Sequence, residues 1–321
     1  MKLRKLGKTA IDITPIGLGC WQFSQGAGVI GGVWDTLAQA TMTDIVKAAL
    51  DGGINWFDTA EAYGNGKSEQ ALAAALQGLG RQPGDVVVAT KWMPLMRTAG
   101  HLVRSVGERQ KFLSPYPIDL LQIHNPFALS NLEKQARGLA QLLKTNQVKS
   151  VGVSNFNAKA MRTVHHVLAG EGLVLAANQV HYNLAARTIE TDGTLEAAKE
   201  LGITIIAYSP LAQGLLTGRF HNDPAQVAKV HMFRRLRNGL DEKGLAKTKP
   251  LVDTLVQIAS RYQAGGIAAT AGQVALNWLA TYHGDTVVVI PGASKVKQAL
   301  EAAHALDFTL TKDESEALFR L

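Results

Sequence analysis

The sequence predicts a single α/β domain over residues 1–321, folded as a (β/α)8 barrel of the TIM type with long loops on its C-terminal face. Eight short aliphatic runs alternate with helical patterns along the whole chain. Polar residues follow these runs at a near-constant interval. Such alternation is typical of a parallel sheet with helical crossovers. Length alone leaves two small domains possible, but no linker or change of composition marks a boundary.

The candidate strands are short runs of β-branched and aliphatic residues. They lie at 13–18, 54–57, 86–90, 120–123, 148–153, 174–180, 203–207 and 286–290. Between them, apolar residues recur at helical spacing over 42–50, 68–76, 132–143, 158–168, 195–201 and 271–279. Two long segments, 21–41 and 211–250, follow the first and seventh strands. Long loops on the catalytic face usually bind substrate or cofactor, so we expect that role for both.

Composition narrows the class of partner. The net charge of +7, from 33 Lys and Arg against 26 Asp and Glu, favours an anionic partner such as a phosphorylated cofactor or nucleic acid. Basic residues are scattered apart from Arg234, Arg235 and Arg237, without an aromatic-rich motif, so we expect no nucleic-acid binding. The single cysteine, Cys20, excludes an intramolecular disulfide and suits a reducing compartment. No secretory signal or apolar run of ~18 residues is visible, which predicts a cytoplasmic protein that binds no membrane.

Two glycine-rich segments imitate nucleotide-binding motifs but lack the required context. Segment 26–31, G-A-G-V-I-G, matches the dinucleotide fingerprint, yet no strand leads directly into it and no helix follows. We therefore expect the loop at 26–32 to help select the substrate. Segment 64–68, G-N-G-K-S, resembles the end of a P-loop, but Glu61 stands where that motif needs its first glycine. Neither H-E-x-x-H nor G-x-S-x-G occurs, so we expect no metal and no serine nucleophile.

Polar residues follow the apolar strands at intervals close to the length of one βαβ unit. The intervals are 33, 33, 30, 25 and 29 residues, between Asp58, Lys91, His124, Ser154, Gln179 and Tyr208. Each of these residues therefore falls at the C-terminal end of a strand. In a barrel of this kind that face carries the active site.

Four residues at the ends of strands two to four could act together on a carbonyl group. Reduction needs a hydride donor, an acid that protonates the developing alkoxide, and donors that polarise the carbonyl oxygen. Tyr63 is a candidate acid, the ammonium of Lys91 would favour its ionised form, and the carboxylate of Asp58 would hold Lys91 in place. His124 would orient the substrate and polarise its carbonyl. Singly, each could be a cap, a packed ring or a solvated charge, but the joint placement favours a catalytic set.

The chain resembles a known family. Segment 53–69, G-I-N-W-F-D-T-A-E-A-Y-G-N-G-K-S-E, is similar to the signature of the aldo-keto reductase superfamily. Further markers lie at 120–126, 151–156, 178–179, 207–211, 214–219 and 290–294, so the resemblance covers essentially the whole chain. It implies a (β/α)8 barrel, dependence on NADP(H), no metal, and catalysis by Asp58, Tyr63, Lys91 and His124, with Tyr63 as the general acid.

The resemblance also implies which residues bind the cofactor. Those expected to hold or stack on the nicotinamide are Ser154, Asn155, Gln179 and Tyr208. Those expected at the pyrophosphate are Ser209, Leu211, Gly214 and Leu215, with Gly218 and Arg219 closing over it. Those expected at the adenosine end, at the start of a helix, are Pro291, Gly292, Ser294, Lys295, Gln298 and Glu301. Lys295 could pair with a 2′-phosphate. Many relatives have Asn where this chain has Ala302, which removes one adenine contact, while Arg234 and Arg235 fit either a phosphate clamp or a solvated basic face.

Residues that follow the strand ends on the same face would line the substrate pocket. They are Trp21, Trp34, Trp92, Met93, Asn125 and Phe127, and core or loop packing is the alternative for each. An aromatic and apolar pocket suits many carbonyl compounds. The proteins that this chain resembles include reductases of sugars, pyridoxal and xenobiotic carbonyl compounds. The superfamily also contains potassium-channel β-subunits, so a regulatory module is the competing class. The sequence indicates neither the physiological substrate, the preferred direction of reaction nor the oligomeric state.

Overall fold

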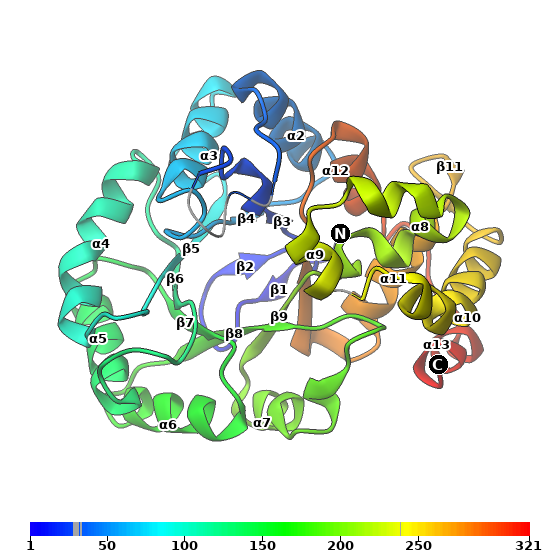
Figure 1. The fold of residues 1–321 in the computed structure, drawn as a ribbon. Coiled ribbons are helices and arrows are strands. Elements are labelled where there is room, and N and C mark those ends of the chain that lie inside the picture. Colours follow the sequence, from blue (N-terminus) through cyan, green and yellow to red (C-terminus); the bar gives the residue numbers. More distant parts are fainter. Residues whose placement is uncertain (28–31, 33, 238) are drawn as a thin grey trace.

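The computed structural model describes residues 1–27, 32, 34–237 and 239–321. Within these residues, eight parallel strands follow one another around a barrel in chain order, and helices cover its outside (Figure 1). The strands are β3 (Leu18–Gly19), β4 (Trp56–Asp58), β5 (Val87–Trp92), β6 (Leu120–Ile123), β7 (Val151–Ser154), β8 (Leu175–His181), β9 (Thr204–Tyr208) and β12 (Val287–Ile290). The predicted (β/α)8 fold class is confirmed.

Eight helices flank the barrel strands, and three of them begin at a residue whose side chain caps the helix. The eight helices are α2 (Gln39–Asp51), α3 (Lys67–Gly78), α4 (Ala99–Leu113), α5 (Leu132–Lys144), α6 (Ala158–Ala169), α7 (Thr194–Leu201), α11 (Ala271–Thr281) and α12 (Val296–Ala303). Asn131 and Asn157 accept backbone N–H bonds at the starts of α5 and α6, and Thr270 forms a capping box at α11. Such caps stabilise helix ends that would otherwise leave backbone donors unsatisfied.

The barrel closes where the first and last strands meet. The Gly17 N–H donates to the carbonyl of Val289 at 2.9 Å, and the Gly19 N–H donates to that of Pro291 at 3.0 Å. A further parallel bridge joins Gly19 to Gly292. Close approach requires glycine here, because a Cβ on Gly17 would overlap the indole of Trp56.

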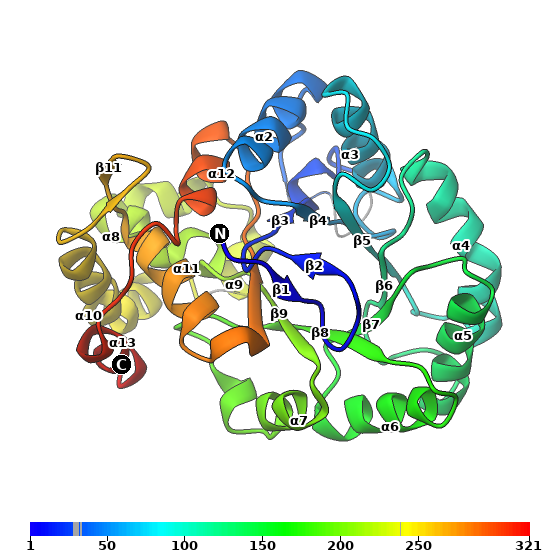
Figure 2. The same ribbon diagram turned by 180° about the vertical axis from the view of Figure 1, so that it is seen from behind.

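The N-terminal end of the barrel is filled by apolar side chains. The antiparallel hairpin β1 (Arg4–Lys5) and β2 (Asp12–Ile13) crosses this end, as Figure 2 shows. Leu6 and Ile13 from the hairpin segment pack with Trp56, Ile206 and Val288 inside the barrel. The interior is therefore a dry core at this end, and only the opposite end is left for polar chemistry.

The long segment after β9 folds beside the barrel. It contains α8 (Arg219–Asn222), α9 (Met232–Arg237) and α10 (Glu242–Ala259), which gather near α11 at one side of Figure 1. A small hairpin of β10 (Gln263–Ala264) and β11 (Ile267–Ala268) and the C-terminal helix α13 (Lys312–Phe319) complete the chain.

Two local differences separate the structure from the sequence-based expectation. The run at 13–18 is divided, because Ile13 joins the hairpin and Leu18 joins the barrel. Pro15 between them has no N–H to donate to a sheet, and the Thr14 N–H bonds the side chain of Asn55 instead. Helix α4 was not among the expected segments. Its few apolar residues, such as Leu102, stand among charged and polar ones.

We expect Gly17→Ala to lower the free energy of unfolding by about 1–3 kcal/mol, because the new methyl group overlaps Trp56 and pushes on the barrel seam. Gly107→Ala is the matched control. Gly107 lies exposed in the interior of α4, with no neighbour near its added methyl, so we expect a gain of up to ~1 kcal/mol. Urea unfolding of both variants checks the contrast, and equal stabilities would contradict the packing argument.

Candidate active site

The polar residues expected at the strand ends meet at the C-terminal end of the barrel. Asp58 ends β4 and Lys91 lies in the neighbouring strand β5. Both side chains are buried, and the Lys91 ammonium donates to Asp58 Oδ1 and, at 2.9 Å, to the carbonyl of Thr59. Charges this deeply buried persist only when they are paired and hydrogen-bonded, which these contacts achieve.

Tyr63 and His124 stand on the loops directly after β4 and β6 and lie over this ion pair. The Lys91 Nζ is 5.0 Å from the centroid of the Tyr63 ring. The ring of His124 approaches that of Tyr63 edge-on, with centroids 5.7 Å apart. The backbone N–H of His124 donates to the carbonyl of Trp92, which fixes this loop against β5. The structure thus brings together all four residues that the sequence singled out as a catalytic set.

The electrostatics of the cluster differ between its members. Burial raises the pKa of Tyr63 above its ordinary value, the Lys91 ammonium opposes that rise, and Asp58 adds to it. Burial by itself would lower the pKa of Lys91, but Asp58 and Tyr63 outweigh it, so the net shift is upward. Burial, together with the Lys91 charge, lowers the pKa of His124 to about 3. At neutral pH the cluster therefore holds a protonated phenol, an ammonium and a neutral imidazole.

A glutamine that the sequence reasoning missed completes the surroundings of Asp58. Gln122 in β6 donates from Nε2 to Asp58 Oδ2 at 3.0 Å, and Gln179 in β8 donates to the same oxygen at 2.9 Å. The sequence does carry a signal for Gln122, a polar residue inside the otherwise apolar run of β6. Gln179 was expected at the nicotinamide; its Nε2 donates to Asp58, and its contact with a cofactor stays a prediction.

Trp21 and Trp34 form an aromatic wall beside Tyr63. The indole of Trp21 is stacked with the Tyr63 ring, with centroids 6.1 Å apart, and the Trp34 ring meets Trp21 edge-on at 5.6 Å. The guanidinium of Arg234, from α9, lies 3.8 Å from the centroid of Trp34. The segment after β3 and the segment after β9 therefore meet over one side of the site. Residues 28–31 of the glycine-rich loop lie outside the described residues.

Three of the expected substrate residues lie on the loops after β5 and β6. The Asn125 amide contacts the sulfur of Met93 at 3.5 Å, and Asn125 Oδ1 accepts the backbone N–H of Phe127 at 3.0 Å. Met93 and Asn125 are half-buried, whereas the Phe127 side chain is largely exposed.

Trp92 was expected to line the pocket, and the structure corrects this. Its side chain is buried in the core, and its Nε1–H donates to His101 on α4 at 3.1 Å. Successive side chains of a strand point to opposite faces. Because Lys91 points into the barrel, Trp92 must point out toward the helices.

On the opposite side, residues expected around the nicotinamide form a hydrogen-bonded group. Asn155 has a left-handed backbone (φ 61°), and its amide donates to the carbonyl of His124 at 3.1 Å and to Ser154 Oγ at 3.0 Å. The hydroxyl of Tyr208 donates to Asn155 Oδ1 at 2.9 Å. Ser154 is buried, while Asn155 is exposed at the surface of the group. A left-handed asparagine at a strand end is a strained feature of the kind found at ligand-binding sites.

The turn after β9 has an unusual run of left-handed residues. Ser209, Ala212, Gln213 and Gly214 all have positive φ values, from 46° to 99°. The guanidinium of Arg219 lies so near Gly214 that a Cβ there would come within 2.8 Å of it. Burial lowers the pKa of Arg219, and its Nε is a buried donor without a protein partner among the described residues.

The other residues expected at the pyrophosphate lie in or next to this turn, within and after η3 (Ala212–Thr217). Leu215 is buried in the core, so only its backbone could reach a ligand. Leu211 is half-buried and packs near Gly272 of α11. Gly218 has a φ of 79° and ends the turn before α8.

Residues expected at the adenosine end lie in the turn after β12 and in α12: Pro291, Gly292, Ser294, Lys295, Gln298 and Glu301. The Oε1 of Gln298 accepts the backbone N–H groups of Ser294 at 2.8 Å and Lys295 at 3.1 Å. This glutamine therefore caps the start of its own helix. Lys295 is exposed beside that start, where the helix dipole favours an anion.

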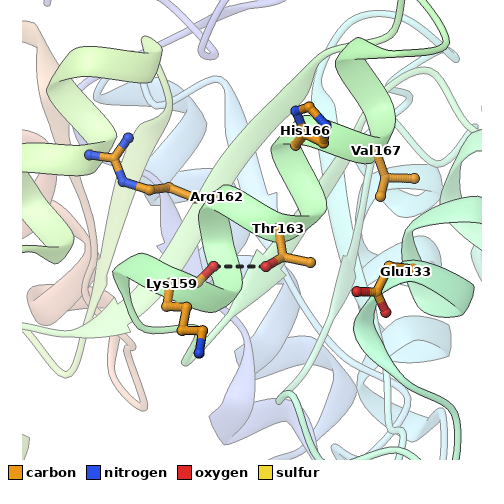
Figure 3. A pocket seen from close by; sticks show the side chains of 6 residues that line it. All are labelled: Glu133, Lys159, Arg162, Thr163, His166 and Val167. Carbon is orange, nitrogen blue, oxygen red and sulfur yellow. Dashed lines mark hydrogen bonds between the residues drawn. The ribbon is translucent and has the colours of Figure 1, made fainter.

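A surface groove of about 590 Å³ lies away from this cluster, between α5 and α6 (Figure 3). Its lining residues are Glu133, Lys159, Arg162, Thr163, His166 and Val167. None of them belongs to the cluster of Asp58, Tyr63, Lys91 and His124. Among the described residues, no group of three or more His, Cys, Asp and Glu could hold a metal ion. In the same residues, no helix has the length and apolar character of a membrane span.

A barrel with this cluster defines a class of oxidoreductase, and comparison with known proteins agrees. The model of the aldo/keto reductase family matches residues 15–320. An uncharacterized oxidoreductase of Mycobacterium tuberculosis is 36% identical over 96% of this chain and 88% of its own length. The chloroplastic pyridoxal reductase of Arabidopsis thaliana is 30% identical over 97% and 84%. The structure of a glycerol dehydrogenase from Gluconobacter oxydans covers 99% of this chain and 94% of its own, with TM-score 0.80 and 26% identity. This chain belongs to the aldo/keto reductase family.

We expect His124 to make the protein less stable in acid. Its pKa is about 3 in the folded protein and ~6.5 when unfolded, so only the unfolded chain takes up this proton as pH falls below ~6.5. Between pH 7 and 5 the parent should lose about 1–2 kcal/mol more of its unfolding free energy than His124→Gln does. Urea unfolding at both pH values measures this difference, and equal losses would show that His124 is protonated normally in the fold.

Proposed function

We propose that this protein reduces aldehydes or ketones to alcohols with NADPH and that Tyr63 supplies the proton. The single observation that carries the proposal is the Tyr63 ring seated over the buried Asp58–Lys91 ion pair and beside a neutral His124. Membership in the aldo/keto reductase family supports the reaction class.

Each member of the cluster has a distinct task in this proposal. Tyr63 donates its phenolic proton to the carbonyl oxygen, and the Lys91 ammonium stabilises the phenolate that remains. The Asp58 carboxylate holds Lys91 in position, and hydrogen bonds from Gln122 and Gln179 hold Asp58. The neutral His124 orients the carbonyl oxygen by a hydrogen bond, because an imidazole without charge can donate without competing for the proton.

Residues on the opposite side fit the nicotinamide cofactor that the family generally uses. A bound NADPH would supply the hydride. The exposed amide of Asn155 suits a carboxamide, and the buried, unpartnered Nε of Arg219 beside Gly214 suits a phosphate oxygen. Lys295 at the start of α12 would pair with the 2′-phosphate that distinguishes NADPH from NADH.

The proposed partner is a small carbonyl compound that enters between the aromatic wall and the loops after β5 and β6. Trp21 and Trp34 would bound one side, and Met93, Asn125 and Phe127 the other. The single cysteine is buried, which fits work in the reducing cytoplasm.

Tyr63→Phe should lower kcat by ~10² to 10⁴-fold, because it removes the one proton donor of the set and leaves its packing intact. NADPH affinity, measured by fluorescence titration, and the melting temperature should stay near the parent. Tyr116→Phe is the matched control, since the Tyr116 hydroxyl donates to the Arg81 carbonyl far from the site. It should cost about 1 kcal/mol of stability and leave the rate unchanged. A Tyr63→Phe rate within a few-fold of the parent would show that another group supplies the proton.

Lys295→Ala should raise the KM for NADPH about tenfold and leave the KM for NADH nearly unchanged, because only NADPH carries the 2′-phosphate. Lys297→Ala is the control, since Lys297 is an equally exposed lysine two positions further on, within 3.7 Å of Glu301. It should change neither KM by more than about twofold. Steady-state kinetics with both cofactors measures these KM values. If Lys295→Ala raised the KM for NADPH and the KM for NADH equally, Lys295 would not bind the 2′-phosphate.

A further inference from the structure

At the catalytic end, an ion pair that the proposed chemistry does not use joins two loops, and a backbone hydrogen bond joins a third loop to them. Glu61 lies on the loop after β4, two residues before Tyr63, and its carboxylate receives the guanidinium of Arg97 from the loop after β5. The other Glu61 oxygen accepts the backbone N–H of Met93 at 3.1 Å. The Arg97 carbonyl in turn accepts the N–H of Leu129, on the loop after β6, at 2.8 Å.

The ion pair between Glu61 and Arg97 is largely buried and is anchored to the barrel. The Glu61 side chain is only 12% exposed and that of Arg97 34% exposed, so the pair is largely withdrawn from water. Removing one partner of such a pair leaves a poorly solvated charge behind. Glu61 also donates its own N–H to the carbonyl of Lys91, so the pair is anchored to the strand that carries the catalytic lysine.

The tied loops expose four large apolar side chains beside the catalytic cluster. Leu95, Met96, Phe127 and Leu129 are between 63% and 75% exposed, and we call them the apolar rim. Met96 has a left-handed backbone (φ 57°), a strained conformation for a side chain of its size. The rim adjoins the site at Phe127, whose backbone N–H donates at 3.0 Å to Oδ1 of Asn125, the neighbour of His124.

We propose that Glu61 and Arg97 are positioning residues that hold the apolar rim as a binding surface for the extended apolar tail of a carbonyl substrate. The proposal rests on the proposed reductase function and deepens it, since it names long-chain aldehydes as the preferred substrate class. Exposed apolar side chains grouped around an active-site mouth gain free energy when a ligand covers them.

The test is the dependence of KM on chain length, with NADPH as cofactor and propanal, hexanal and octanal as substrates. Full burial of a methylene is worth about fourfold in affinity, so half-burial on an open rim is worth about twofold. For the parent we expect KM to fall about 30-fold from propanal to octanal. Arg97→Gln frees the loop after β5, and we expect the fall to shrink to about threefold, with kcat changed less than KM.

Two variants control the interpretation. Arg97→Lys keeps the charge opposite Glu61, so it should restore most of the chain-length dependence. Arg162→Gln breaks an ion pair of the same type with Glu200 on the outer helices and should leave the dependence as in the parent. Melting temperature and NADPH fluorescence titration on each variant show that the fold and the cofactor site are intact.

The outcomes separate the two proposals. If the parent oxidises NADPH with none of the aldehydes, the reductase function itself fails. If the parent reduces all three with one KM, the rim does not bind the tail. If Arg97→Gln keeps the full 30-fold dependence, the rim binds without help from the ion pair, and the positioning role is wrong.

Discussion

The site depends on one buried interaction, the carboxylate of Asp58 with the ammonium of Lys91. Both charges lie where water does not reach, and the cost of removing them from water is met only by their mutual attraction and by the donors around them. Two glutamine amides, from β6 and β8, bond the second oxygen of Asp58. The position of the charge under Tyr63 is thus set by four strands, β4, β5, β6 and β8. A barrel can hold such a charge because parallel strands end at one level.

The same barrel separates stability from chemistry along its axis. At the N-terminal end the hairpin residues Leu6 and Ile13 close a dry apolar core. At the C-terminal end the strand interiors turn polar, and left-handed residues such as Asn155 and Ser209 begin the loops. Strain of this kind is tolerated where a well-packed framework supports it. The well-packed apolar end therefore stabilises a fold whose polar end contains strained loops.

Much of the fold, and the catalytic cluster, could be predicted from the sequence because both follow from periodicity. Alternating strands and helices predict the barrel, and polar residues at strand ends predict which side chains meet. Trp92 was misplaced because the strand alternation that points Lys91 inward was not applied to its neighbour. The division at Pro15 has a local signal in the proline itself, but the bond from the Thr14 N–H to Asn55 joins residues 41 positions apart and could not be read from the sequence. The tie between Glu61 and Arg97 joins separate loops, so only the folded chain shows it.

The seam of the barrel has a consequence for how the chain is made. The first barrel strand is complete by Gly19, yet its partner on one side is the segment around Val289 and Pro291, close to the other end of the chain. During synthesis on the ribosome, the edge of β3 stays without its neighbour until β12 has emerged. An open parallel sheet with a bare edge is prone to pair with other chains. The edge of β3 is therefore covered only by a strand that comes more than 260 residues later in the chain.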